Sequence, residues 1–459
     1  MGATGTAVTA RLAAARVLVA LERGRTTLSR EIEEDRPNLE DPRDRGLLLE
    51  IVAGVLRWQS ALDACLATRS TRPVAALAPE VRAVLRAGAY QLLYLDRLPA
   101  HAVVHESVEV VRQLKHSRAA GFVNAVLRGL LRGGDARTAL PAAPADPADR
   151  DAALDYLSVT LSHPRWLVAR WLDRYGLDAA ARWCEFNNTS PAVTIRPMGS
   201  NGASALLQDL TERGVAAALS PFAPDSIRLP AGSLGRLDED LRRRIVIQDE
   251  GSQMVALAAN AAPGLRVLDV CAAPGGKTML LQRAVGATGL VIAGDHRPAR
   301  VRLLQSRLKM LGSPAPVLAL DAAASLPFTD TFDRVLLDAP CSGLGTLRRD
   351  PDLKWNRTLD DLAGFAEAQV RMIQSASAAV RPGGTLTYAT CSSEPEENEA
   401  VVERFLQSAP EFRRQAVTVP ASLPQAARLI DETGYLHTLP FRDEVDAFFA
   451  ARLVRSATA

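Results

Sequence analysis

The first 135 residues carry apolar positions at helical spacing. One face of the stretch 81–98 is apolar at intervals of three and four residues, and its members are Val81, Val84, Leu85, Leu92 and Leu93. The stretches 100–116 and 119–133 repeat the pattern, and the second ends on two glycines. No convincing alternating strand precedes residue 135. We therefore expect an all-α domain over residues 1–135, a helix bundle of ordinary domain size.

The next part of the chain changes character twice. Residues 136–150 are rich in Pro, Ala and Asp and show no period, which is typical of a linker. Over residues 151–240 a helical stretch at 162–176 is followed by two short strand candidates, 192–198 and 226–230. This mixture predicts a small α+β module.

Apolar runs alternate with helical stretches from residue 241 to residue 459. The strand candidates are residues 266–272, 289–295, 316–322, 332–340 and 384–391. Because these runs are apolar throughout, we expect a parallel sheet covered by helices on both faces, with a late alternating strand at 445–455. The pattern predicts an open, doubly wound α/β domain of the Rossmann-like class.

Composition restricts the compartment and the charge. The chain of 459 residues is 47% hydrophobic and 23% charged, with a net charge of +2, so any nucleic-acid surface has to be a local patch. No stretch resembles a membrane span, and Arg11, Arg16 and Glu22 interrupt the apolar N-terminal stretch, which argues against a signal peptide. We expect a cytoplasmic protein. Its five cysteines are odd in number and lack C-x-x-C spacing, so we expect neither a disulfide framework nor a metal site.

Polar residues follow three of the predicted strands around a glycine-containing loop. The loop "DVCAAPGGKT", residues 269–278, would let backbone amides approach a ligand at a helix N-terminus. Asp295 ends the second strand, where a carboxylate can accept ribose hydroxyls, and Asp321 ends the third, in position for an adenine edge. A single such Asp is as readily a helix cap or turn residue, but the group favours a nucleotide-like ligand. The absence of G-x-G-x-x-G disfavours a nicotinamide oxidoreductase.

Two cysteines follow the fourth and fifth strands. Cys341 and Cys391 each lie in a turn rich in Pro, Gly or Ser, where the backbone leaves the core. If the strands are parallel neighbours, about 4.8 Å apart, both thiols face the crevice in which such sheets bind ligands. A cysteine on a buried strand is usually a small apolar filler, the interpretation we favour for Cys65 and for Cys271.

Three motifs carry a resemblance to a known family. They are "DVCAAPGGKT", "LLDAPCSGLGTLRRDPDLKW" and "TYATCSSEPEENE", which resemble the signatures of the NOL-NOP-Sun family of S-adenosylmethionine-dependent RNA 5-methylcytosine methyltransferases. "QDEGSQMVALAA" before them and "TLPFRDEVDAFFAARL" after them are also similar to that family. In the helical part, residues 100–129 resemble a NusB-like RNA-binding domain. The fusion is similar to the Sun-type bacterial enzymes that methylate 16S ribosomal RNA.

The resemblance implies a covalent reaction. Cytosine C5 is a poor nucleophile, and addition of a thiolate at C6 makes it reactive toward a methyl sulfonium. By resemblance, Cys391 is the nucleophile, Cys341 serves release, and Asp338 lies against cytosine N3 and the exocyclic amine. The residues expected to contact S-adenosylmethionine are Cys271, Ala272, Ala273, Pro274, Gly275, Gly276, Lys277, Asp295, Asp321 and Asp338.

Several expectations accompany this interpretation. We expect a monomer that acts on 16S ribosomal RNA, with the helical domain and the middle module contributing RNA-binding surface and residues 348–355 on the RNA side. The acidic run 394–399 suits a helix N-terminus, and Asn398 and Glu399 could shape the active-site loop. Arg300 either pairs with a carboxylate or is a solvated helix residue. Two alternatives stay open, a tRNA cytosine-C5 methyltransferase and a non-catalytic RNA-binding assembly factor.

Overall fold

The chain forms two compact units in a computed structural model. The structure describes residues 8–24, 26–35, 39–198, 202–420 and 422–457. One unit, the helical unit, comprises Met1–Thr189 and Leu347–Arg357, and the other, the sheet unit, comprises Ser190–Thr346 and Thr358–Ala459. Residues 151–189 thus group with the preceding helices and 190–240 with the following sheet. The two units do not test the four-part division into domains, which stays a prediction from the sequence.

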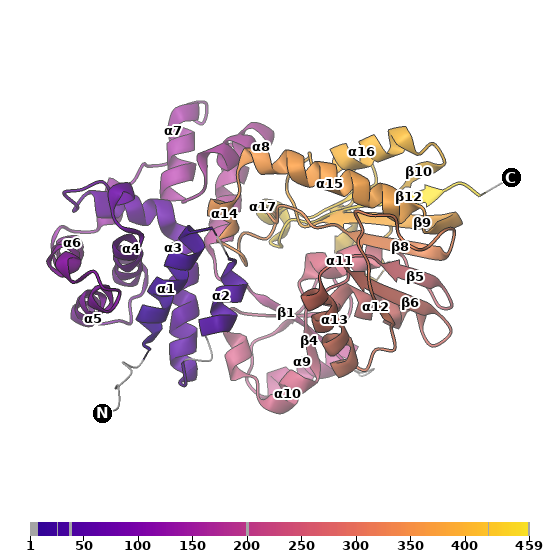
Figure 1. Cartoon of the computed structure of the whole chain (residues 1–459), viewed down its shortest axis with the longest axis horizontal. Helices are drawn as coiled ribbons and strands as arrows, with labels where there is room; N and C mark the ends of the chain where they lie inside the picture. The colour runs from indigo at the N-terminus through magenta and orange to yellow at the C-terminus, as the bar shows by residue number, and fades with distance from the viewer. Residues whose placement is uncertain (1–7, 25, 36–38, 199–201, 421, 458–459) are drawn as a thin grey trace. The chain divides into compact units, whose positions relative to one another are not determined.

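The helical unit contains the helices expected in the first part of the chain. Its α-helices are α1 (Ala10–Glu22), α2 (Leu28–Asp35), α3 (Pro42–Ala67), α4 (Pro79–Tyr94), α5 (Ala100–Gln113), α6 (Ala120–Arg132), α7 (Arg150–Asp155), α8 (Arg165–Asn188) and α14 (Leu353–Asn356) (Figure 1). The predicted helices at 81–98, 100–116 and 119–133 are confirmed as α4, α5 and α6. The first strand of the described residues begins only at Val193. A single apolar core joins α1, α3, α4, α5 and α6.

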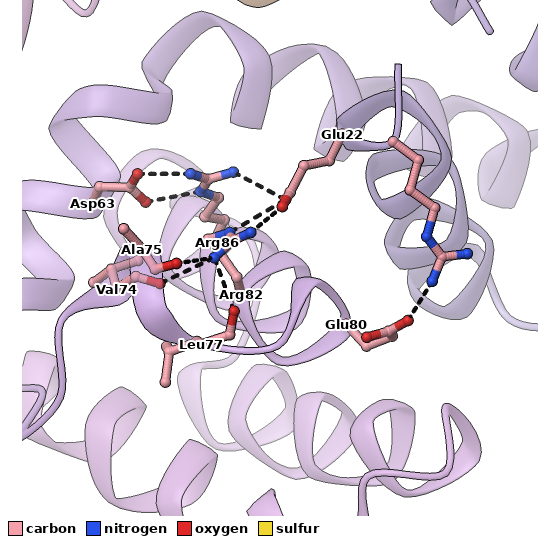
Figure 2. Close-up of polar contacts among 9 residues, drawn as sticks. Glu22, Asp63, Val74, Ala75, Leu77, Glu80, Arg82 and Arg86 are labelled. Atoms are coloured by element: carbon pink, nitrogen blue, oxygen red, sulfur yellow. Dashed lines mark hydrogen bonds and ion pairs between the residues drawn. The ribbon is translucent and has the colours of Figure 1, made fainter. Parts of the chain in front are cut away.

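Two arginines of α4 join this helix to its neighbours in the bundle, and one of them, Arg82, also binds the short turn at 74–76, as Figure 2 shows. The Arg82 guanidinium donates to Glu22 of α1 and to the carbonyls of Ala75 and Leu77, the last two at 2.9 Å. One turn later, Arg86 donates to both carboxylate oxygens of Asp63 on α3 at 2.8 and 2.7 Å. Both guanidinium groups are therefore occupied within the unit, and their role is structural.

The segment Leu347–Arg357 lies in the core of the helical unit. Lys354 is 1% exposed, and its ammonium donates to the carbonyls of Arg57 at 3.2 Å and Ser162 at 3.3 Å and to Asn188 Oδ1 at 2.7 Å. Burial lowers the pKa of Lys354 well below its usual value. The sequence expectation that residues 348–355 lie on the RNA side is wrong for their buried charged members, because carbonyl and amide acceptors within the helical unit bind the lysine there. Those members are Arg348, Asp352 and Lys354.

A small antiparallel sheet begins the sheet unit. Its strands are β1 (Val193–Pro197), β2 (Ala218–Leu219), β3 (Ile227–Leu229) and β4 (Ile245–Ile247), in the order β2-β3-β1-β4. The strand candidates 192–198 and 226–230 are confirmed as β1 and β3. Helix α9 (Gly202–Glu212) packs on this sheet around Ile195 and Leu210, and α10 (Glu239–Arg243) precedes β4.

The large sheet has the order β10-β12-β9-β8-β5-β6-β7, with β11 paired to β12. Its strands are β5 (Arg266–Asp269), β6 (Leu290–Asp295), β7 (Val317–Ala319), β8 (Phe332–Asp338), β9 (Val380–Thr390), β10 (Phe412–Gln415), β11 (Leu436–His437) and β12 (Phe449–Arg455). The neighbouring strands β7, β6, β5, β8 and β9 are parallel, as predicted. Strand β12 pairs antiparallel with both β9 and β10. Strand β11 also pairs antiparallel with β12, and the one-turn helix α17 (Pro440–Asp443) lies between them. The late alternating strand predicted at 445–455 is confirmed as β12, which makes the sheet mixed at this edge.

Helices cover both faces of the large sheet (Figure 1). Helices α15 (Leu359–Ser377) and α16 (Glu399–Ser408) lie on one face, and α11 (Glu250–Ala258), α12 (Gly276–Val285) and α13 (Pro298–Met310) lie on the other. Alternate residues of β8 enter the two cores, Val335 and Leu337 on the α15 side and Leu336 on the α12 side. Within the described residues, no helix is long and apolar enough to cross a membrane.

Candidate active site

The two cysteines at the strand ends meet. Strands β8 and β9 are parallel neighbours in which Asp338 pairs with Ala389, so the turns after them leave the sheet side by side. The Sγ atoms of Cys341 and Cys391 are 3.3 Å apart. The Cys391 turn is closed by the Gly345 amide, which donates to the Cys391 carbonyl at 2.9 Å. A Cβ at Gly345 would lie 2.1 Å from the Ala447 carbonyl oxygen, so only glycine fits at this close approach.

The surroundings treat the two thiols differently. The hydrogen bond with Cys391, burial and the negative charge of Glu397 raise the pKa of Cys341 well above its usual value. The charge of Cys391 instead acts on a lysine. Burial alone would lower the pKa of Lys277, but Asp338 and Cys391 outweigh burial, and the pKa of Lys277 is raised. The cation of Lys277 therefore lies near the Cys391 sulfur, whereas Cys341 holds its proton.

Lys277 and Asp338 form an ion pair at the mouth of this crevice. Lys277 Nζ donates to Asp338 Oδ2 at 2.7 Å, and their side chains are 14% and 25% exposed. The pair joins the first turn of α12 to the end of β8. The resemblance placed Lys277 among the cofactor contacts and Asp338 against both the cofactor and cytosine, and the structure brings the two groups into direct contact.

The glycine-containing loop turns tightly between β5 and α12. Gly275 has a φ of +103°, a left-handed conformation that an L side chain rarely adopts, and a Cβ there would lie 3.1 Å from Leu304. Gly275 is also the N-cap of α12 and offers no side chain to the first-turn amides of that helix. Those amides are consequently available to an anionic ligand group.

Asp295 is held between this loop and the next helix. The Asp295 Oδ2 atom accepts from the Ala273 amide at 3.2 Å and from Arg300 Nε at 3.1 Å, and Arg300 also donates to the Ala273 carbonyl at 2.7 Å. Arg300 thus pairs with a carboxylate rather than with solvent. The Asp295 Oδ1 atom has one long contact, with the Arg297 amide at 3.4 Å, and remains able to accept from a ligand hydroxyl.

The remaining predicted residues are distributed as follows. Asp321 lies after β7 with an exposed carboxylate that accepts from the Ala323 amide at 2.9 Å. Cys271 lies in the loop, and burial raises the pKa of its thiol. Ala272 and Ala273 are buried, and Pro274 follows a cis peptide bond.

Two buried carboxylates of the site were missed by the sequence reasoning. Asp269, the last residue of β5, is fully buried, and burial raises its pKa to about 7 while a hydrogen bond from Thr278 at 2.7 Å opposes that rise. Glu397 is also fully buried, beneath the two cysteine turns. The run 394–399 leads into α16 as expected, with Asn398 as the N-cap and Glu399 as the first helical residue, but Glu394 and Glu397 precede the helix and are 0% exposed.

Comparisons with known proteins agree with this arrangement. The family model described as 16S rRNA methyltransferase RsmB/F matches residues 256–454, the NusB family matches 8–132, and the ferredoxin-like domain of RsmF/B-like methyltransferases matches 163–233. The crystal structure of PH0851 has a TM-score of 0.77 at 23% identity and covers 98% of this chain and 99% of its own, which shows a shared fold. A methyltransferase homologue from Pyrococcus horikoshii has a TM-score of 0.54 at 25% identity, over 66% of this chain and 99% of its own.

Curated relatives extend the match to nearly the whole chain. The probable ribosomal RNA small subunit methyltransferase B of Bacillus subtilis is 34% identical over 88% of this chain and 89% of its own length. The ribosomal RNA small subunit methyltransferase B of Pseudomonas putida is 34% identical over 97% of this chain and 98% of its own length. Because these relatives are 34% identical over most of the chain and three family models match it, the chain belongs to the RsmB/F family of 16S rRNA methyltransferases.

Proposed function

We propose that this protein methylates C5 of cytosine in 16S ribosomal RNA, with S-adenosylmethionine as methyl donor and a covalent bond from Cys391 to cytosine C6. The observation that carries the proposal is the pair of sulfur atoms 3.3 Å apart at the ends of neighbouring parallel strands. Two thiols in one crevice suit a reaction in which one bond to the enzyme must form and later break. Family membership supports the ribosomal substrate and a cytoplasmic site of action.

The residues of the glycine-containing loop fit the proposed cofactor. The uncapped first-turn amides of α12 suit a carboxylate, and Asp295 Oδ1 suits a ribose hydroxyl. The exposed carboxylate of Asp321 suits the adenine side. When bound, S-adenosylmethionine supplies an electrophilic methyl group on a sulfonium.

Attack on cytosine requires a thiolate at Cys391. The raised pKa of Lys277, to which Asp338 and Cys391 contribute, places a cation near the Cys391 sulfur, where the thiolate is needed. The Cys391 sulfur donates an electron pair to C6, and the electron density moves toward C5 and N3. Asp338, oriented by its 2.7 Å contact with Lys277, is our candidate for the group that contacts N3 and the exocyclic amine.

Release requires a base at C5. We assign this role to Cys341, whose raised pKa makes its thiolate a strong proton acceptor once it forms. In this step Cys341 first gives its own proton to solvent, the resulting thiolate takes the C5 proton, the C5–H electron pair re-forms the C5–C6 double bond, and the S–C6 pair returns to Cys391. Because the two sulfurs are close together, Cys391 can attack C6 and Cys341 can deprotonate C5 of the same base.

The test combines substrate mapping with two variants. The purified protein is incubated with 16S ribosomal RNA or small subunits and methyl-labelled S-adenosylmethionine, and 5-methylcytosine is mapped by sequencing. Cys391→Ala should abolish methylation, and Cys341→Ala should accumulate a protein–RNA adduct that appears as a shifted band on a denaturing gel. Cys65→Ala, which removes a buried thiol of the helical unit, serves as the control and should still methylate.

Three outcomes would count against parts of the proposal. An adduct in Cys391→Ala with normal turnover in Cys341→Ala would reverse the two roles. Normal turnover in both variants would refute the covalent route. Methylation of tRNA in place of 16S ribosomal RNA would refute the proposed substrate.

A further inference from the structure

Glu397 lies beneath the two cysteine turns with every hydrogen bond of its carboxylate directed to them or to their support. The carboxylate is 0% exposed. Its Oε1 atom accepts from the Ser342 amide at 2.8 Å, and its Oε2 atom accepts from the hydroxyls of Ser342 and Ser392, each at 2.5 Å. Ser342 follows Cys341 and Ser392 follows Cys391, so a single side chain is bonded to the residue after each thiol.

Two neighbouring amides complete the arrangement. Gln369 Nε2, from α15, donates at 3.0 Å both to Glu397 Oε1 and to the carbonyl of Pro340, the residue before Cys341. The Asn398 amide nitrogen donates to the Ser392 carbonyl at 3.0 Å, and its oxygen accepts from the Thr390 hydroxyl at 2.5 Å. We call Gln369, Glu397 and Asn398 the thiol clamp. Through it, the residues on both sides of each cysteine are fixed to one another.

The energetics argue that this contact is more than general packing. A carboxylate removed from water is costly unless several donors compensate it, and removing such donors leaves an uncompensated buried charge. Among the described residues, no arginine or lysine forms an ion pair with Glu397, and three of its four donors come from the residues that follow the thiols. The Glu397 carboxylate can therefore stay buried only while the Cys341 and Cys391 turns keep their positions, and the turns are held in place by the same contacts.

We propose that Glu397 is a positioning residue that sets the separation of the Cys341 and Cys391 sulfurs, with Gln369 and Asn398 as its supports. The inference rests on the proposed function, because it gives the short sulfur–sulfur distance a role in attack and release. Glu397 does not touch the reacting atoms and acts through Ser342 and Ser392. Its charge has a second effect, since it is one of the causes that raise the pKa of Cys341.

The kinetic test separates positioning from binding. Glu397→Ala should lower kcat about 100-fold, the order expected for a misplacement of about 1 Å, while KM for RNA and Kd for S-adenosylmethionine change less than about threefold. Glu397→Gln keeps the shape, and rotated serine hydroxyls can accept from its amide, so it should recover at least about tenfold of that loss. Glu403→Gln removes an exposed carboxylate from the same helix, α16, and should behave as wild type. A kcat for Glu397→Ala within about threefold of wild type would overturn the proposal, as would a parallel loss of cofactor affinity.

A second measurement needs neither RNA nor turnover. In a Cys391→Ser background, iodoacetamide labelling of Cys341 is followed against pH by peptide mass spectrometry. Glu397→Gln should move the labelling midpoint to lower pH because a negative charge beside the thiol is lost, and Glu403→Gln should leave it in place. An unchanged midpoint in Glu397→Gln would contradict the electrostatic part of the inference. If the wild type makes no 5-methylcytosine but the midpoint moves, the proposed function fails while the contact between Glu397 and the thiol turns stands.

Discussion

Replacing Asp269 by asparagine should change how the stability of the sheet unit depends on pH. Asp269 is fully buried at the end of β5, its Oδ2 accepts from Thr278, and its Oδ1 has no partner in the described structure. Burial raises the pKa of the folded carboxyl from an ordinary 3.8 to about 7. Asparagine keeps the acceptor for Thr278 and resembles the protonated acid, but it does not ionise.

The sign and size follow from linkage between protonation and folding. The proton on Asp269 stabilises the folded state fully below pH 3.8, and this contribution is lost as the pH rises toward 7, because the unfolded chain ionises first. A difference of about 3 between the two pKa values corresponds to about 4 kcal/mol. Between pH 5 and pH 8, Asp269→Asn should therefore gain about 2 to 3 kcal/mol relative to wild type.

The assay has to report the sheet unit alone. All five tryptophans, at positions 58, 166, 171, 183 and 355, lie in the helical unit, so their fluorescence would follow the wrong part of the molecule. Native-state hydrogen exchange should be measured on peptides that cover β5 and β8. Comparing variant and wild type at each pH cancels the intrinsic exchange rate.

Asp333→Asn is the control, and its effect on stability should have the opposite pH dependence. Its burial is outweighed by hydrogen bonds from Arg266 and Arg381, the pKa of Asp333 is lowered, and its contribution is lost as the pH falls. Parallel stability curves for Asp269→Asn and wild type would refute the reasoning.

Three further predictions test the rest of the site. Lys277→Met should lower kcat/KM at least about 100-fold and reduce the thermal stability, because it leaves Asp338 without its cation, and adding Asp338→Asn should restore part of the stability but not the activity. Gly275→Ala should lower the free energy of unfolding by about 1 to 2 kcal/mol because of its left-handed φ, and it should weaken S-adenosylmethionine binding measured by calorimetry. Gly364→Ala is the control on α15, where an added Cβ meets nothing within 4 Å, and it should stabilise the protein. In the wild type, the rate at which the protein–RNA adduct decays should rise up to about tenfold per pH unit from pH 7 to 8, because the proposed release uses the Cys341 thiolate. A decay rate that does not change with pH would remove Cys341 from that step.

The sequence predicted the parts of the fold that depend on local patterns. Apolar runs such as 332–340 gave strands because both faces of the inner sheet are buried, and helical spacing gave α4 to α6 because each has one apolar face. The strand ends that bring Cys341 and Cys391 together follow from parallel topology, which the alternation of strands and helices implies.

Other features depend on partners that are distant in the sequence. An acidic run is usually solvated, and nothing local distinguishes Glu397, whose donors arrive from residues 342, 369 and 392. Lys354 similarly looked like a surface residue, yet its acceptors come from α3, from the loop before α8 and from the end of α8. The direction of β12 was also beyond pattern reasoning, because an alternating strand pairs equally well in either direction until its connection is known.

The place of β12 has a consequence for the order in which the protein can assemble. This strand is among the last described residues of the chain, yet it lies inside the sheet, between β9 and β10. While the chain is being synthesised, the free edge of β9, the strand that ends beside Cys391, therefore stays open until residues 449–455 have left the ribosome. The Cys391 turn is thus framed late, and a nascent chain should complete this site only after β12 has emerged.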